Sequence, residues 1–150
     1  QKTRQEFRGH RRLRTLWRAV RVVKPAAATV RFGWRTSLEL RLLQREQRIH
    51  DALRLLAPYF SAEMHQRARE AARIRHGESR AVGLAGAIAL QEAIDAYRRQ
   101  EPVTDEPLPH IGVNFTDHLD AVAQALSRPR VLTRIRQWLI STESSTTAHV

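Results

Sequence analysis

The strongest local pattern in the chain is the segment Arg11-Arg12-Leu13-Arg14-Thr15-Leu16-Trp17-Arg18-Ala19-Val20. Its apolar side chains recur at three- and four-residue steps, which places them on one face of an α-helix: Leu13, Leu16, Trp17 and Val20. We predict a first helix over about residues 3–23, ended by Lys24-Pro25 because proline disfavours a helical residue before it. Trp17, a large aromatic on the apolar face, is expected to be buried.

Helical spacing also dominates the sequence up to residue 100, and no segment alternates apolar and polar residues as a strand does. A second helix is expected over residues 27–57, before Pro58. A third should start after Ser61, a good N-cap, and stop at Gly77, and a fourth should be capped by Ser79 and reach about residue 100. The expected buried positions are Leu38, Leu42, Ile49, Leu53 and Leu56 in the second helix, and Val82, Leu84, Ile88, Ile94 and Tyr97 in the fourth.

Residues 101–109 hold three prolines and three acidic residues and are predicted to form an extended connector. A helix capped by Thr116 should follow, with Leu119, Val122 and Leu126 on one face. Another should begin at Ser127 and Pro129, and residues 141–150 are expected to be irregular. Its apolar face would carry Val131, Leu132, Ile135, Trp138 and Leu139. These two helices are expected to dock either on a neighbouring subunit or back on the core.

The sequence therefore predicts an all-α protein, a small bundle of three to four core helices with two further C-terminal helices after the proline-rich connector. We place a helical domain at residues 1–100 and a C-terminal extension at residues 101–150. A chain of 150 residues suits one core, and no stretch approaches the roughly 20 apolar residues that cross a bilayer. The absence of cysteine excludes disulfides and thiolate chemistry.

Nothing in the sequence predicts an enzyme. The seven histidines form no metal-binding pair at helical spacing, and the local group of His110, Asp117, His118 and Asp120 is interpreted as a solvated connector. There is no nucleophile elbow and no phosphate-binding loop. The small residues over 81–89 favour close helix packing, with a narrow acyl channel as the alternative. We expect a non-catalytic protein without a metal or a cofactor of its own.

The charge of the chain is concentrated at one end. Residues 1–54 carry 15 Lys and Arg against four acidic residues, whereas residues 55–150 are balanced, so the whole net charge of +11 lies in the first third. An arginine stripe lies opposite the apolar face of the first helix: Arg4, Arg11, Arg14, Arg18 and Arg21. Like charges at this spacing repel each other, which indicates binding to a polyanion, an acidic protein or an acidic membrane surface.

The stretch from Arg11 to Val20 resembles the signature helix of the LYR-motif family, with Leu16-Trp17-Arg18 in place of Leu-Tyr-Arg. A second stretch, from Arg80-Ala81-Val82 through Leu90 to Gln100, is similar to the third helix of the LYR-type accessory subunit of respiratory complex I. The resemblance covers roughly residues 6–100. It implies a small mitochondrial protein on the matrix side of the inner membrane.

The resemblance also implies a partner, the mitochondrial acyl carrier protein, whose acidic surface would meet the first helix. The implied contacts are Arg11, Arg14, Leu16, Trp17, Arg18 and Arg21. The only cofactor would be the acyl-phosphopantetheine arm of that carrier. The expected function is then a non-catalytic accessory subunit of complex I. The alternative is a structural protein of a mitochondrial ribosome that binds ribosomal RNA through the same arginines. No helix-turn-helix or zipper pattern supports DNA binding.

Overall fold

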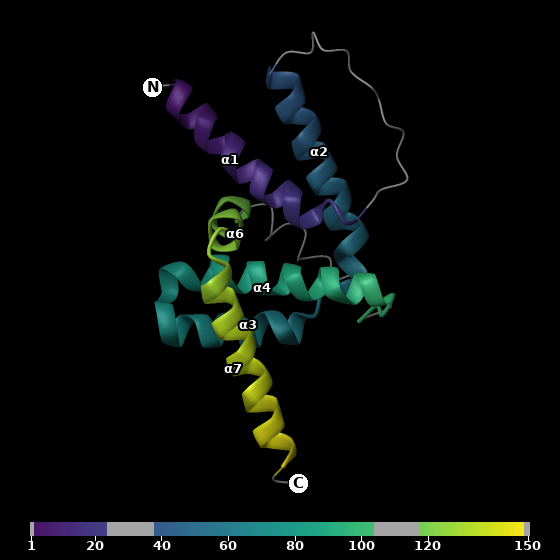
Figure 1. Cartoon of the computed structure of the whole chain (residues 1–150), viewed down its shortest axis with the longest axis vertical. Helices are drawn as coiled ribbons and strands as arrows, with labels where there is room; N and C mark the ends of the chain where they lie inside the picture. The colour runs from purple at the N-terminus through teal and green to yellow at the C-terminus, as the bar shows by residue number, and fades with distance from the viewer. Residues whose placement is uncertain (1, 24–37, 104–117, 149–150) are drawn as a thin grey trace.

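A computed structural model describes residues 2–23, 38–103 and 118–148, and within these ranges the chain is helical and contains no strand (Figure 1). The predicted all-α fold class is confirmed. The elements are α1 (Lys2–Val20), α2 (Leu38–Leu56), the short 3-10 helix η1 (Ala57–Tyr59), α3 (Ala62–His76), α4 (Glu78–Arg99), α6 (Leu119–Leu126) and α7 (Pro129–Thr147). The expected start of the second helix, the Thr116 cap and the connector beyond residue 103 lie outside the described residues.

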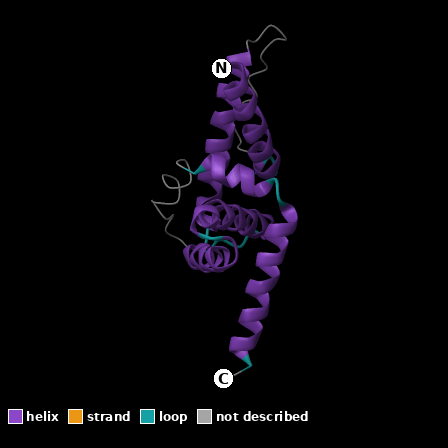
Figure 2. Ribbon diagram, turned by 90° about the vertical axis from the view of Figure 1, so that its left-hand side faces the viewer, coloured by secondary structure: helices purple, strands orange, loops and turns teal. Residues whose placement is uncertain are grey.

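The helices build an elongated molecule around a central pair. α3 and α4 run side by side across the middle, α1 and α2 lie together on one side of this pair, and α7 crosses it and runs out on the other side (Figures 1 and 2). The short α6 packs between α1 and α4. The start of α1 and the end of α7 are therefore at opposite ends of the molecule.

The turn between α3 and α4 is a single glycine. Ser61 caps α3 as predicted, because its hydroxyl accepts a hydrogen bond from the Met64 amide at 3.1 Å. Gly77 ends α3 with φ of +85° and ψ of 165°, a conformation that side-chain-bearing residues rarely adopt. The predicted Ser79 cap is wrong, because Gly77 itself is the N-cap of α4 and Ser79 already lies inside its first turn.

The tail expected to be irregular is helical as far as Thr147. The hydroxyls of this serine- and threonine-rich segment donate to carbonyl oxygens four residues earlier, as Ser141 does to Gln137 at 3.0 Å and Ser145 does to Ser141 at 3.0 Å. These bonds give the hydroxyls partners inside the helix, although serine and threonine are weak helix formers. An ion pair between Arg67 of α3 and Glu143 also fixes the segment.

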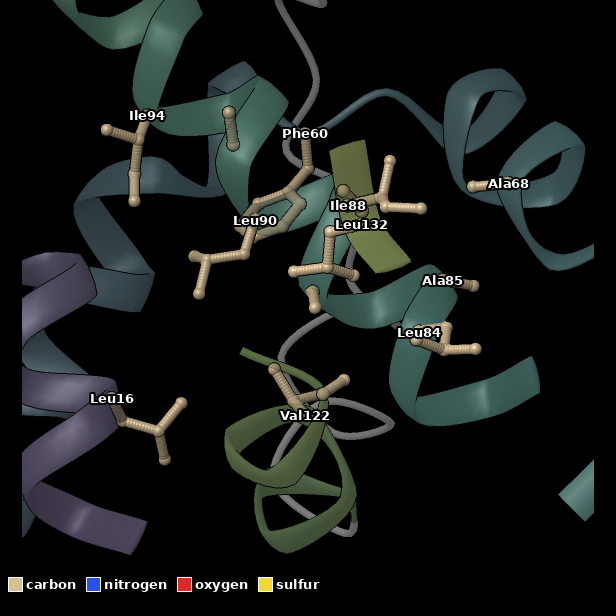
Figure 3. Packing of buried hydrophobic residues seen from close by; sticks show 14 of the residues in the cluster. Leu16, Phe60, Ala68, Leu84, Ala85, Ile88, Leu90, Ile94, Val122 and Leu132 are labelled. Carbon is tan, nitrogen blue, oxygen red and sulfur yellow. The ribbon is translucent and has the colours of Figure 1, made fainter. Parts of the chain in front are cut away.

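One apolar core joins all the helices. Figure 3 shows Leu16 of α1, Val122 of α6, Leu132 of α7 and Phe60 gathered around α4. Helix α4 is central because most of its residues are buried, whereas α3 buries only Ala68, Ala71 and Ala72. The core also contains Val20, Val23, Ile49, Leu53, Leu56, Leu84, Ile88, Leu90, Ile94, Ile135 and Leu139.

Several residues that were expected to be buried are only partly so. Leu13, Trp17, Val82 and Tyr97 are half-buried, because they lie where the apolar face meets the surface. Trp138 is 36% exposed, and its ring faces the Arg75 guanidinium at 5.4 Å. The side chains of Leu38 and Leu42 lie outside the described residues.

In addition to the shared apolar core, one arginine links helix α7 to α4. The Arg136 guanidinium donates to Glu92 Oε1 at 2.8 Å and to Asp95 Oδ2 at 2.9 Å. All three side chains are about one-third exposed. Although partial burial lowers the pKa of Arg136, the hydrogen bonds to Asp95 and Glu92 outweigh it and raise that pKa overall.

Candidate partner-binding surface

Helix α1 has two chemically distinct faces. Leu16 and Val20 are 1% and 0% exposed, which places one face in the core. The opposite face is made of exposed arginines, and we call it the arginine face: Arg11, Arg14, Arg18 and Arg21. The side chain of Arg4, also part of the predicted stripe, lies outside the described residues. The amphipathic pattern alone thus positions four guanidinium groups on one side of the helix.

The position of α1 is fixed by packing and by one ion pair. The helix packs against α2 and α6 (Figure 1). Arg12, which points away from the arginine face, pairs with Asp120 of α6 at 2.7 Å. The Thr15 hydroxyl donates to the Arg11 carbonyl at 3.0 Å within the helix. The arginine face is therefore presented by an anchored helix.

Counter-charges for the arginine face are absent from the part of the chain that the structure describes. Of the acidic residues of the neighbouring α2, Asp51 faces Arg54 at 3.7 Å and Glu46 faces the His50 ring at 3.9 Å, whereas the side chain of Glu39 lies outside the described residues. Asp120 is taken by Arg12. Four adjacent arginines without an acidic partner repel each other, so the folded protein favours an external anion at this place.

Trp17 lies at the edge of the arginine face. Its ring is half-buried, and the Arg48 guanidinium of α2 stands over it at 5.9 Å from the ring centroid, within cation–π range. No pattern in the sequence pointed to Arg48, because its partner is on another helix. Trp17 thus connects the core of the α1–α2 pair to its basic surface.

The predicted contact residues are only partly brought together. The structure places the four arginines on one exposed face with Trp17 beside them. Leu16 is separated from them, because it points into the core and is 1% exposed. The surface that a partner meets is therefore cationic with one aromatic edge.

The described ranges offer neither a metal site nor a helix suited to span a membrane. They contain no group of three side chains that could hold a metal ion. Of the local cluster named above, His110 and Asp117 lie outside the described residues and Asp120 is paired with Arg12. None of the helices in these ranges is both long and apolar enough to span a membrane.

The fold and this surface define an all-helical protein with a basic face on its first helix. A family model matches residues 2–137, and the chain belongs to that family, DUF6545, which is described as a family of unknown function. No curated protein and no solved structure matches the chain.

The match corrects the resemblance to the LYR-motif family, which is wrong. The match to the DUF6545 model covers both stretches on which the resemblance rested and continues through α6 into α7. The reason for the false resemblance is physical. A leucine, an aromatic residue and an arginine follow one another wherever the apolar face of an arginine-rich helix borders its charged face, as Leu16, Trp17 and Arg18 do.

Proposed function

We propose that this protein is a non-catalytic docking module that binds an acidic protein surface through the arginine face of α1. The observation that carries the proposal is the exposure of Arg11, Arg14, Arg18 and Arg21 on an anchored helix, without an acidic partner among the described residues. Binding to such a face is most favourable when the partner supplies the carboxylates that the described residues lack.

The chemistry of arginine favours carboxylates as the ligand. Of the 26 basic residues in the chain, 24 are arginine, and lysine occurs only at positions 2 and 24. A guanidinium group forms two parallel hydrogen bonds with one carboxylate, whereas an ammonium group acts as a point charge. A surface built from guanidinium groups therefore selects a partner by geometry as well as by charge.

The extent of the arginine face favours a protein over a nucleic acid. Arg11 and Arg21 are ten residues apart, which is about 15 Å along a helix. This length matches an acidic patch on one small protein. The remaining two-thirds of the chain is electrically balanced, so a long polyphosphate would find no continuous basic path beyond this end.

Several narrower predictions stay untested. The place in mitochondrial complex I, the matrix location and the acyl-phosphopantetheine arm were all implied by the LYR resemblance. An acyl carrier protein remains one acidic protein with which the arginine face can be tested. Ribosomal RNA remains the alternative ligand, and charge reversal combined with nuclease treatment distinguishes it from an acidic protein.

The decisive experiment is charge reversal on the arginine face. The full-length Arg14→Glu/Arg18→Glu variant is compared with wild type in quantitative affinity purification, and the partners recovered are tested again as purified proteins. The matched control is Arg130→Glu/Arg134→Glu, two exposed arginines of α7 that have no ion pair within the described part of the chain. Circular dichroism verifies that all three proteins are equally helical.

The expected result is that the doubly reversed protein loses its acidic protein partner, with a dissociation constant at least about a hundredfold weaker, whereas the control retains it. Binding of purified acyl carrier protein to the wild-type protein tests whether the carrier is that partner. Release of the wild-type partner by nuclease alone, with affinity falling linearly in the logarithm of salt concentration, would favour RNA instead. Retention of the protein partner by the Arg14→Glu/Arg18→Glu variant would exclude the arginine face as the binding surface.

A further inference from the structure

A second cationic site lies away from α1, in a hollow where α3 ends, α4 and α7 begin and α6 crosses α4. The hollow has a volume of about 180 Å³. We call it the basic hollow. Its rim carries His76, Ser79, Arg80, Gln124 and Arg128. Figure 1 shows the α3–α4 turn and the start of α7 on one side of the molecule, next to α6.

The rim of the basic hollow is positively charged. Arg80 and Arg128 are exposed, and neither side chain has an ion pair or a hydrogen bond within the described ranges. No acidic residue lines the hollow. Glu78 stands next in sequence to the rim but is not part of the lining, and Asp120 is paired with Arg12. Two guanidinium groups therefore face one small space without a counter-charge.

Backbone groups at the α3–α4 turn carry partial charges of both signs. The first hydrogen bond of α4 runs from the Ala81 amide to the Gly77 carbonyl at 3.2 Å, so the amides of residues 78–80 precede the helical hydrogen-bond pattern. Gly77 has no side chain to cap them. The amino end of α4 thus brings a partial positive charge near Arg80, whereas the carboxyl end of α3 brings a partial negative charge, and the positive charge of the rim comes from the two guanidinium groups.

The floor of the basic hollow is apolar. It is formed by Gly83 and Leu84 of α4, Ala121 and Ala125 of α6, and Val131 of α7. A cavity of about 150 Å³ lined by apolar side chains accommodates a benzene molecule, which sets the scale. The whole hollow, rim included, is of this scale, so an apolar group of about benzene size can lie on the floor while its polar group reaches the open rim.

We propose that the basic hollow binds a small organic anion, with a phosphate or carboxylate group between Arg80 and Arg128 and an apolar body of about benzene size on the floor. This site is independent of the arginine face of α1 and shares no residue with it. The rim supplies charge-assisted hydrogen bonds, and the floor supplies burial of apolar area.

Phenyl phosphate is the probe that tests both parts of the hollow. It is titrated into the isotope-labelled full chain while backbone amide chemical shifts are recorded. We expect saturable shifts at Ser79, Arg80, Gly83 and Val131, with a dissociation constant below about 1 mM. Benzylamine, which has the same ring and the opposite charge, and inorganic phosphate, which lacks the ring, should bind at least about tenfold more weakly.

Variants locate the binding. Arg80→Gln/Arg128→Gln should weaken phenyl phosphate by about tenfold or more for each lost charge-assisted contact, whereas Arg130→Gln/Arg134→Gln should leave it unchanged. Val131→Phe, which fills the floor while keeping both arginines, should also abolish binding. The Arg14→Glu/Arg18→Glu variant should bind phenyl phosphate as tightly as wild type does. The two proposals are therefore tested separately, and a failure of the docking function would not affect this one.

Four results would overturn the proposal. The first is the absence of saturable shifts at these residues up to several millimolar phenyl phosphate. The second is equal binding of benzylamine, which would remove the charge argument. The third is equal binding of inorganic phosphate, and the fourth is full binding by a folded Val131→Phe protein, because either would remove the apolar floor from the site.

Discussion

A Cβ atom placed on Gly83 would lie 2.6 Å from the carbonyl oxygen of Ala121. This separation is much shorter than a normal nonbonded contact, so α4 and α6 cross at a point where only glycine fits. At Gly83, the run of small residues over 81–89 therefore allows close helix packing, which is one of the two interpretations of the sequence. The close approach brings Val122, Ala123 and Ala125 of α6 into the core.

The first prediction concerns this crossing. Gly83→Ala should destabilise the protein by about 1–3 kcal/mol, because the new methyl group meets backbone atoms of Ala121, so that α4 or α6 must shift. This cost should exceed the gain of about 1 kcal/mol that alanine brings to a helix interior. Urea unfolding followed by circular dichroism measures the difference. Ser79→Ala, at an exposed position of the same helix, is the control and should change stability by less than about 0.5 kcal/mol. A Gly83→Ala protein as stable as wild type would contradict the close crossing.

The second prediction concerns the attachment of α7. Arg136→Met should destabilise the protein by about 1–2 kcal/mol, because it leaves Glu92 and Asp95 side by side without their shared cation. Arg134→Met on the exposed side of α7 is the matched control. Neutralising both acids in the Arg136→Met background, with Glu92→Gln and Asp95→Asn, should restore part of the loss. If thermal and urea unfolding find the two methionine variants equally stable, Arg136 does not hold α7 in place.

The third prediction compares the two neighbouring residues Leu16 and Trp17. Leu16→Ala should cost about 2–5 kcal/mol, because Leu16 is 1% exposed in the core. Trp17→Ala should cost about 1–3 kcal/mol, less than for a fully buried tryptophan, because its ring is only half-buried beside Arg48. Urea unfolding gives both values. A larger loss at Trp17 than at Leu16 would reverse the assignment of core and edge.

The fourth prediction concerns pH. Burial, with a smaller contribution from Arg69, lowers the pKa of His65 below its ordinary value of 6.5. The unfolded chain therefore binds a proton at His65 more readily than the folded chain does, and stability should fall as pH drops through 6.5 and below. His65→Gln should remove this part of the pH dependence. Urea unfolding of both proteins between pH 8 and pH 5 tests it, and parallel stability curves would show that His65 does not contribute.

Local patterns in the sequence predicted the structure correctly where all the interacting groups belong to one helix. The spacing of Leu16 and Val20 predicted the buried face of α1, and Ser61 was correctly identified as a cap because its hydroxyl needs only the amide of Met64. Ser79 failed as a cap because the α3–α4 turn is shorter than its sequence suggested. The end of α7 was missed because serine and threonine disfavour a helix by themselves, and Arg67 of a distant helix stabilises it.

The helical class of this protein and the division of α1 into an apolar face and an arginine face follow from the order of the residues, because both depend on the 3.6-residue period of one helix. The surroundings of these residues depend instead on how the helices pack together. Asp120 meets Arg12, Arg48 stands over Trp17, and Arg80 faces the same hollow as Arg128, although each pair is more than 30 residues apart in sequence. Such contacts depend on how helices pack, and packing is set by the whole core: the crossing at Gly83 places α6, and with it the basic hollow.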